Sequence, residues 1–331
     1  MNEPTKASTR RVELATLGEE AVPDFTVRTP SATAASRIRV GSRWLVRLVV
    51  VLLIAMFVHL LVTSKSIEWS VVGHYFTASS VLLGALRTLE LTATGMVIGV
   101  ALGMLLAIMR LSSSTLLNLT GEAYLWLFRG TPLLVQILFW FNLASFIQRI
   151  SIGVPFGPTW VSWQTNSLIT PFVAAILALG LNVGAYMCEI VRAGILSVEQ
   201  GQLEASYVLG MTHGRAMRRI ILPQAMRVII PPTGNMAIAL LKDSSLVSVI
   251  SMTELLYSVQ TIYANTFQTI PLLIVASLWY LVMTTVTSIG QYYLERHFGK
   301  GASRLGGPST LGRLQENFAR LRELKVRLQN S

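Results

Sequence analysis

Four polar side chains lie in otherwise apolar stretches of this sequence and are the residues best placed to do chemistry: Asn182, Asn235, Lys242 and Asp243. A charge at membrane depth costs about 2.5–3.5 kcal/mol on insertion scales, so such a residue must face protein or a wet cavity. Lys242 and Asp243 are adjacent and cannot pair across one helix face, whereas Asn235 and Lys242 share a face. Two interpretations stay open: the four residues line a substrate pathway, or other helices and a helix break satisfy them.

Familiar catalytic arrangements are absent from the sequence. The histidines His59, His74, His213 and His297 are scattered, so they give no metal-ligand spacing. Neither paired carboxylates nor a Ser–His arrangement stands out, and no G-x-x-x-x-G-K-S/T phosphate loop exists. The single Cys188 excludes an intramolecular disulfide. We therefore expect a protein that is not an enzyme and that binds no cofactor or metal itself.

The composition is that of an integral membrane protein, with 52% hydrophobic and 13% charged residues. The net charge of +11 would also suit nucleic-acid binding, but the basic residues gather in alternate loops, so we expect no nucleic-acid partner. They fall in Met1–Arg47, near Arg110 and Arg129, in Arg192–Arg227 and in Arg296–Arg327, whereas Ser151–Cys188 has none. The positive-inside rule then places both termini and the loop around residue 204 in the cytoplasm, which requires an even number of spans.

The long apolar runs predict an all-α integral membrane protein with about six transmembrane helices. These are expected at Leu45–Val62, Leu86–Met109, residues 132–146, Pro171–Ile190, a segment starting near Met226, and Pro271–Leu294. Residues 44–298 thus form a transmembrane domain. Residues 1–43 are predicted to be a disordered cytoplasmic tail, and because they precede the first apolar run we expect no cleaved signal peptide. Residues 299–331 are predicted to form a basic amphipathic cytoplasmic tail.

Small residues recur every four positions in the second span, at Gly95, Gly99, Gly103 and Ala107. Such a stripe lets another helix approach closely, and we predict a helix packing seam there, not a ligand site. The fourth span repeats the step at Gly180 and Gly184.

A polar and basic loop, residues 204–223, separates the fourth and fifth spans. It predicts one short helix over Gly201–Leu209 with Gly210 as its C-cap, and a second that opens at Thr212 as N-cap and stops before Pro223. Three arginines three and four residues apart share one face of the second helix. On chemistry alone, the loop is a rigid cytoplasmic foot that either docks a partner or only spaces two spans.

This loop resembles the EAA loop of ABC importer permeases. The matching residues are Glu204, Ala205, Gly210, Ile220, Leu222 and Pro223, and Ser206 stands where the family usually has its second alanine. The resemblance implies that the loop is a coupling helix, which inserts into a groove of a cytoplasmic ATPase subunit. Within the wider match, residues 198–223 form the coupling loop.

A second segment resembles the polar amino acid branch of these permeases. It runs from Phe128 to Gln136 and includes Arg129, Gly130, Thr131 and Pro132, although Trp126 stands where a glutamate is usual. A structural interpretation is also sufficient: Arg129 anchors the inner interface, Thr131 caps a helix, and Pro132 takes its first turn. The resemblance continues through Glu189–Gln202 and Leu240–Leu246 and covers about residues 82–297.

The resemblance implies the MetI-like fold of type I ABC importers and a multi-pass permease in the cytoplasmic membrane of a prokaryote. It implies ATPase subunits that bind ATP-Mg, a second permease copy or paralogue, and an extracytoplasmic amino-acid-binding protein, besides membrane lipids. The outer loop Ile150–Thr170, with its prolines, glycines and tryptophans, is a candidate docking surface for that binding protein.

For an amino acid substrate, both the carboxylate and the ammonium need partners once water is excluded. We expect Lys242 to meet the carboxylate, and Asp243 the ammonium or a cationic side chain. Free carbonyl groups of a broken backbone at Pro231–Gly234 could also accept from the ammonium. The competing class is a secondary transporter or channel that works alone and uses Lys242 and Asp243, but it leaves the cytoplasmic foot unexplained.

Overall fold

The computed structural model describes residues 32–64, 67–154 and 157–298. The chain divides into two units after residue 65, and each is described by itself. The first unit is helix α1 (Ala32–Thr63), whose apolar run Trp44–Leu60 corresponds to the first predicted span. The predicted N-terminal tail falls on residues 1–31, which lie outside the described residues, and on the first turns of α1.

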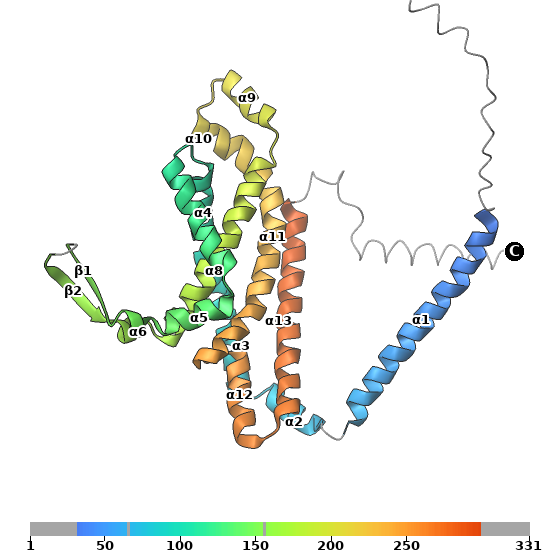
Figure 1. The fold of residues 1–331 in the computed structure, drawn as a ribbon. Coiled ribbons are helices and arrows are strands. Elements are labelled where there is room, and N and C mark those ends of the chain that lie inside the picture. Colours follow the sequence, from blue (N-terminus) through green and yellow to red (C-terminus); the bar gives the residue numbers. More distant parts are fainter. Residues whose placement is uncertain (1–31, 65–66, 155–156, 299–331) are drawn as a thin grey trace, which may run out of the picture. The chain divides into compact units, whose positions relative to one another are not determined.

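The second unit is helical apart from one hairpin (Figure 1). Its long apolar helices are α3 (Ser79–Leu111), α8 (Pro171–Leu196) and α13 (Thr269–Phe298). Its other helices are α2 (Trp69–Phe76), α4 (Thr115–Gly130), α5 (Leu133–Phe141), α6 (Leu143–Phe146), α7 (Thr165–Leu168), α9 (Gln200–Val208), α10 (His213–Ala216), α11 (Leu222–Asp243) and α12 (Leu255–Thr266). A π-helical turn, Met217–Ile221, precedes α11, and a 3-10 helix, Ser244–Ile250, follows it. The strands are β1 (Arg149–Gly153) and β2 (Thr159–Gln164).

The described residues contain three helices long and apolar enough to cross a membrane, α3, α8 and α13. Two bent pairs of helices give two further spans if each pair is counted as one: α4 with α5, bent by 100°, and the run His213–Ile250 with α12, bent by 45°. Together with the apolar run of α1, these elements agree with the predicted multi-span, all-α architecture. The predicted C-terminal tail, residues 299–331, lies outside the described residues.

Helices α3 and α8 pack through glycine. The facing pairs are Gly95–Leu179, Gly99–Val183, Gly103–Met187, Ile98–Gly180 and Leu102–Gly184. Each helix therefore inserts side chains where the other has none, and the pairs advance four residues at a time along both helices. The predicted packing seam is confirmed, and it forms the centre of the larger of two apolar cores.

The smaller core joins α2, α3, α11, α12 and α13 around Leu241, Leu255 and Leu272. It contains a fully buried carboxylate, Glu254, at the N-cap of α12. Glu254 accepts hydrogen bonds from the backbone nitrogens of Leu256 (2.8 Å) and Tyr257 (2.7 Å). Tyr280 Oη of α13 also donates to it, at 2.9 Å.

The two adjacent prolines at 231 and 232 lie inside α11, so the predicted break at Pro231–Gly234 is wrong. Proline removes an N–H and bends a helix, yet membrane helices tolerate it because neighbouring helices satisfy the freed backbone groups. The freed carbonyls are those of residues 227 and 228, one turn before the prolines. In the same segment Gln291 of α13 donates to the carbonyl of Pro231 (3.2 Å) and to Asn235 Oδ1 (3.0 Å). Gly234 makes room for it, since a Cβ there would lie 2.6 Å from Gln291 Cγ. This segment is thus helical and is held against α13 by Gln291.

The outer loop expected over Ile150–Thr170 contains an antiparallel hairpin of β1 and β2, which the sequence analysis missed. The two strands are short, and prolines and glycines lie between them, so the alternation typical of strands was hard to recognise in the sequence.

The seam predicts opposite effects for two glycine-to-alanine substitutions. In Gly103→Ala the new Cβ would lie 2.9 Å from the backbone nitrogen of Cys188, so backbone must move, and we expect a loss of about 1–3 kcal/mol in the free energy of unfolding. In Gly290→Ala no atom lies within 4 Å, so this variant should be neutral or more stable by up to about 1 kcal/mol. Thermal unfolding in detergent, followed by circular dichroism, compares them, and a Gly103→Ala protein as stable as the wild type would contradict the seam.

Candidate functional site

The loop between α8 and α11 folds into a compact elbow, which we call the foot (residues 198–223), at one end of α8 (Figure 1). Helix α9 ends at Val208 with Leu209 as its C-cap residue, and Gly210 follows with a φ of +73°, the left-handed conformation that glycine adopts without strain. Gly210 N donates to Tyr207 O (2.9 Å) and Met211 N to Ser206 O (3.0 Å), which satisfies the free carbonyls of the helix end. The prediction that Gly210 terminates this helix is confirmed, although the C-cap residue is Leu209, one position earlier.

The second part of the foot differs from its prediction. Thr212 is the N-cap residue of α10, as expected, but its side chain makes no capping hydrogen bond. The helix does not stop before Pro223: it widens into the π-helical turn and continues as α11, with the proline in the first turn, where a missing N–H costs little. The foot is therefore joined rigidly to the fifth span.

The foot presents a mixed apolar and basic surface. Glu204 and Ala205 are exposed, while Ser206 is fully buried and donates to Leu203 O at 2.6 Å, so a small residue is required there. At the end of α9, Val208 and Leu209 are 87% and 79% exposed, which the sequence analysis missed. Of the remaining predicted residues, Ile220 is half-buried, and Leu222 and Pro223 are exposed.

A helix break gives the branch segment its shape. Helix α4 ends at Gly130 and α5 begins at Leu133, so Thr131 is the C-cap of α4 and not the predicted cap of the following helix. Its hydroxyl donates back to Leu127 O at 2.8 Å. The buried side chain of Gln136 fills the break, because its Nε2 donates to Phe128 O (2.9 Å) and Thr131 O (3.1 Å).

Asn182 of α8 reaches the same break. Its Nδ2 donates to Phe128 O at 3.1 Å and to Gln136 Oε1 at 3.3 Å. Asn182 thus helps to hold the end of α4. This structural role is additional to its predicted role in a substrate pathway.

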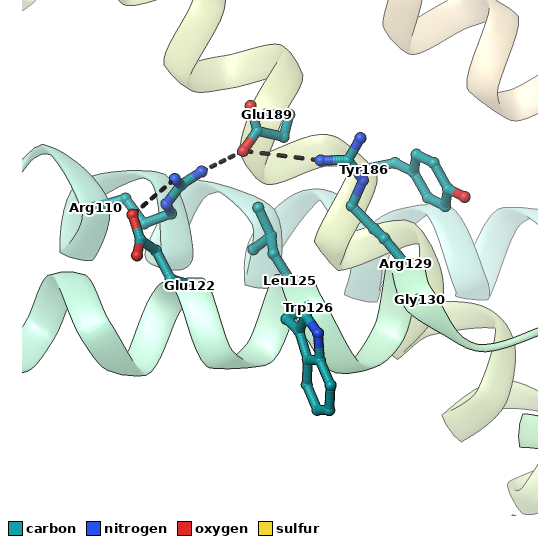
Figure 2. A pocket seen from close by; sticks show the side chains of 8 residues that line it. All are labelled: Arg110, Glu122, Leu125, Trp126, Arg129, Gly130, Tyr186 and Glu189. Carbon is teal, nitrogen blue, oxygen red and sulfur yellow. Dashed lines mark hydrogen bonds and ion pairs between the residues drawn. The ribbon is translucent and has the colours of Figure 1, made fainter.

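Glu189 of α8 is the centre of an ion cluster (Figure 2). Arg110 of α3 pairs with its Oε1, and Arg129 at the end of α4 lies 3.9 Å from the same oxygen. Arg192 Nη2 lies 3.5 Å from Oε2, and Arg110 Nη2 also lies 3.3 Å from Glu122 Oε1. The cluster therefore ties together three helices that the sequence separates.

A cavity of about 450 Å³ opens beside this cluster, with Trp126 at its edge. The Trp126 side chain is 79% exposed and makes none of the ion pairs. Because tryptophan stands where a glutamate is usual, this position adds no negative charge to the cluster. Arg129 and Tyr186 line this cavity, and the Arg129 guanidinium lies 5.5 Å from the Tyr186 ring centre, a cation–π contact.

A second cavity, of about 570 Å³, brings together polar residues from α4, α8 and α11. Its lining residues are Arg129, Gly130, Thr131, Pro132, Leu133, Asn182, Val183, Tyr186, Met236, Ala239, Leu240 and Asp243. Two of the four predicted pathway residues, Asn182 and Asp243, thus share one cavity, and the branch residues 129–132 form its wall.

The other two pathway candidates do not line this cavity. Lys242 is exposed at the neighbouring position, and Asn235 turns toward α13, where its Oδ1 accepts from Gln291. Asp243 makes no ion pair with any residue that the structure describes. The cation in this cavity is Arg129, which the sequence analysis placed only at the membrane interface. No local sequence pattern predicts that Arg129 and Asp243 line the same cavity, because the packing of α4, α8 and α11 places them there.

The ion cluster predicts that two glutamates differ in their effect on stability. Glu189→Gln leaves Arg110, 14% exposed, without its main partner, and we expect a loss of about 2–4 kcal/mol in unfolding free energy. Glu90→Gln breaks the exposed pair with Arg87 (2.6 Å; side chains 55% and 42% exposed) and should cost about 0–1 kcal/mol. Equal thermal stabilities of the two purified variants would contradict a structural role for the cluster.

Comparison with known proteins places this geometry in a family. Residues 99–300, more than half of the chain, match the family model described as the inner membrane component of binding-protein-dependent transport systems. The chain is 42% identical to the arginine transport system permease protein ArgU of Corynebacterium glutamicum, over 85% of this chain and 88% of the relative. It is 33% identical to the histidine/lysine/arginine/ornithine transport system permease protein HisQ of Escherichia coli K12, over 70% and 98%.

A solved structure agrees with these relatives. A chain from a crystal structure of an amino acid ABC transporter with histidines is 36% identical, and the match covers 66% of this chain and 94% of that one with a TM-score of 0.57. The resemblance to the polar amino acid branch of ABC permeases is confirmed, and the chain belongs to the family of inner membrane components of binding-protein-dependent transport systems.

Proposed function

We propose that this chain is the transmembrane permease subunit of an ATP-driven importer of polar or charged amino acids. The observation that carries the proposal is a cavity containing Arg129, Asn182 and Asp243, next to α8, which runs on to the exposed foot. The relatives named above are permeases for amino acids, which supports the same substrate class.

ATP hydrolysis belongs to a separate subunit in this proposal. The sequence has no phosphate-binding loop, so ATP-Mg is bound by the ATPase, and the foot is the surface that docks it. Val208 and Leu209 supply exposed apolar contact, and the arginines at 215, 218 and 219 are exposed beside them. The foot and both termini are on the cytoplasmic side, in accordance with the distribution of basic residues.

A second permease copy or paralogue covers the cavity. Charged residues at membrane depth face protein or water, and the cavity lies open on the surface of this single chain. A symmetric or pseudosymmetric pair closes such a surface with the same residues from each partner. An extracytoplasmic binding protein delivers the amino acid at the end of α8 opposite the foot.

Within the cavity, Arg129 takes the substrate carboxylate and Asp243 takes the ammonium group or a cationic side chain. Guanidinium matches a carboxylate with two parallel N–H donors, which a lysine cannot do. Asp243 is free to accept, since no described residue pairs with it. Arg129 therefore replaces Lys242, the residue expected from the sequence, as the partner of the carboxylate. A transporter that works alone through Lys242 and Asp243 has no support from the geometry, because Lys242 lies outside the cavity lining.

Uptake by the complete complex tests this assignment. The complex is purified from its native membrane through a tag on this chain and reconstituted in liposomes with ATP on the side of the foot. Its binding protein and labelled amino acids are supplied on the opposite side. Asp243→Asn should lower uptake about tenfold or more, the loss expected for a charge-assisted hydrogen bond, without lowering the amount of assembled complex. Lys242→Gln is the matched control and should stay within about twofold, since its side chain is solvated.

Three results would count against the assignment. Equal losses in both variants would restore Lys242 as a substrate ligand. Normal uptake by Asp243→Asn would remove the cavity from the pathway. A wild-type complex that hydrolyses ATP but takes up no amino acid would overturn the substrate class itself.

A further inference from the structure

The hairpin of β1 and β2 has a fixed direction. Figure 1 shows it extending sideways from the helices near α6. Thr165, directly after β2, is fully buried, its N donates to Gln148 O at 3.0 Å, and its hydroxyl donates to Ile147 O. The base of the hairpin is therefore closed by buried polar contacts, so its two faces have a defined orientation with respect to the flanking helices.

The two faces of the hairpin differ in chemistry. The register pairs Ile150 with Trp163 and Ile152 with Val161, and because alternate residues share a face, these four lie on one side. Arg149 with Gln164 and Ser151 with Ser162 lie on the other side. Trp160 is the extra residue at the register shift beside Ile152, so it has no cross-strand partner and the register assigns it to neither face. The hairpin is thus amphipathic, with an aliphatic and aromatic face opposite a polar face.

The apolar face is uncovered within the described residues. Ile152, Val161 and Trp163 are 55%, 46% and 40% exposed. A two-stranded hairpin is only marginally stable in water, and edge strands in water usually carry charges that prevent association. Residues 150–164 contain no charged side chain. A surface of this kind is poorly suited to open water.

Two observations indicate lipid as the covering partner. First, tryptophan beside aliphatic residues, with no charge to desolvate, is the composition found at the boundary between lipid headgroups and acyl chains. Second, the residues that lead into the hairpin are also apolar and exposed: Phe146 is 72% exposed and Ile147 48% exposed, and the Phe139 and Phe146 rings lie 5.9 Å apart. The hairpin is joined to both neighbouring spans by short segments, which keeps it near the membrane surface.

We propose that this hairpin is an interfacial anchor: its Ile150, Ile152, Val161 and Trp163 face lies in the headgroup–acyl boundary of the bilayer, and its Arg149, Ser151, Ser162 and Gln164 face meets water. The anchor fixes the connection between α5 and α8 against the membrane plane while the opposite end of α8 carries the foot. This assignment replaces the docking surface for a binding protein that the sequence suggested for the same loop. It depends only on the chain being a membrane protein, and not on the identity of the transported molecule.

Fluorescence quenching of labels on adjacent residues tests the anchor. The complex is placed in nanodiscs of phosphatidylcholine and phosphatidylglycerol, in a Cys188→Ser background that retains transport activity. Val161→Cys samples the apolar face and Ser162→Cys the polar face, each labelled with a small fluorophore. A nitroxide on a shallow acyl position should quench the Val161 label about threefold more than the Ser162 label, and iodide in water should show the reverse order. The pair Ile152→Cys and Ser151→Cys on the other strand must give the same pattern.

Other patterns would overturn the proposal. If iodide reaches both labels equally, the hairpin stands in water or does not keep its two faces. If neither quencher reaches the Val161 and Ile152 labels, protein covers the apolar face, and a second permease copy is the occupant. If ligand-loaded binding protein removes the lipid quenching, the face docks that protein.

Discussion

The close contact of α3 and α8 is the constraint on which the remaining structure depends. Glycines on each helix accept side chains from the other, so the two backbones approach along several turns. Lipid offers no hydrophobic driving force between helices, and such fitted packing is what holds them in register. A fixed α8 in turn sets the places of Asn182, Tyr186 and Glu189, which all lie on this one helix.

Helix α8 therefore connects every feature that bears on transport. At one end it follows the hairpin, in its middle it supplies Asn182 to the helix break of α4 and α5, and near its other end Glu189 gathers arginines from α3 and α4. It then leads through the turn after Leu196 into α9. A displacement of the foot would be transmitted to the cavity wall through this single rod and through α11, which the π-helical turn joins to the foot without a break.

Arg129 lies at the point where these features meet. It lines both cavities, lies 3.9 Å from Glu189, and stacks near Tyr186. Its ion pair with Glu189 is longer than that of Arg110, and 44% of its side chain is exposed. A guanidinium held in this way can turn to a carboxylate in the cavity without leaving a fully buried charge unpaired, since Arg110 continues to neutralise Glu189.

The sequence predicted those features that depend on local spacing. The glycine stripe, the helix termination at Gly210 and the helical spans all follow from residue periodicity and from the backbone freedom of glycine, and the structure confirms them. The errors have one physical origin, which is tertiary contact. Pro231 and Pro232 lie inside a continuous α11, where Gln291 from another helix donates to Pro231 O, and the cation that lines the same cavity as Asp243 comes from α4.

Other residues were missed because their local signals are weak. Glu254 is a single acidic residue before a short helix, and its burial depends on α3, α12 and α13 coming together. Gln136 is the last residue of the branch segment Phe128–Gln136. Its amide fills a helix break only because α4 and α5 meet at a bend of 100°, which the sequence did not predict.

The central claim is that the foot docks a separate ATPase, and crosslinking at its tip tests this most directly. In a Cys188→Ser background, Leu209→Cys places a thiol at a site 79% exposed on the foot, and Trp160→Cys places one at a site 70% exposed on the hairpin. A short thiol-reactive crosslinker added to the native complex should join the Leu209→Cys chain to the ATPase in at least one nucleotide state, and leave the Trp160→Cys chain without that product. Failure of Leu209→Cys to crosslink in every nucleotide state, or an equal yield from Trp160→Cys, would contradict the account.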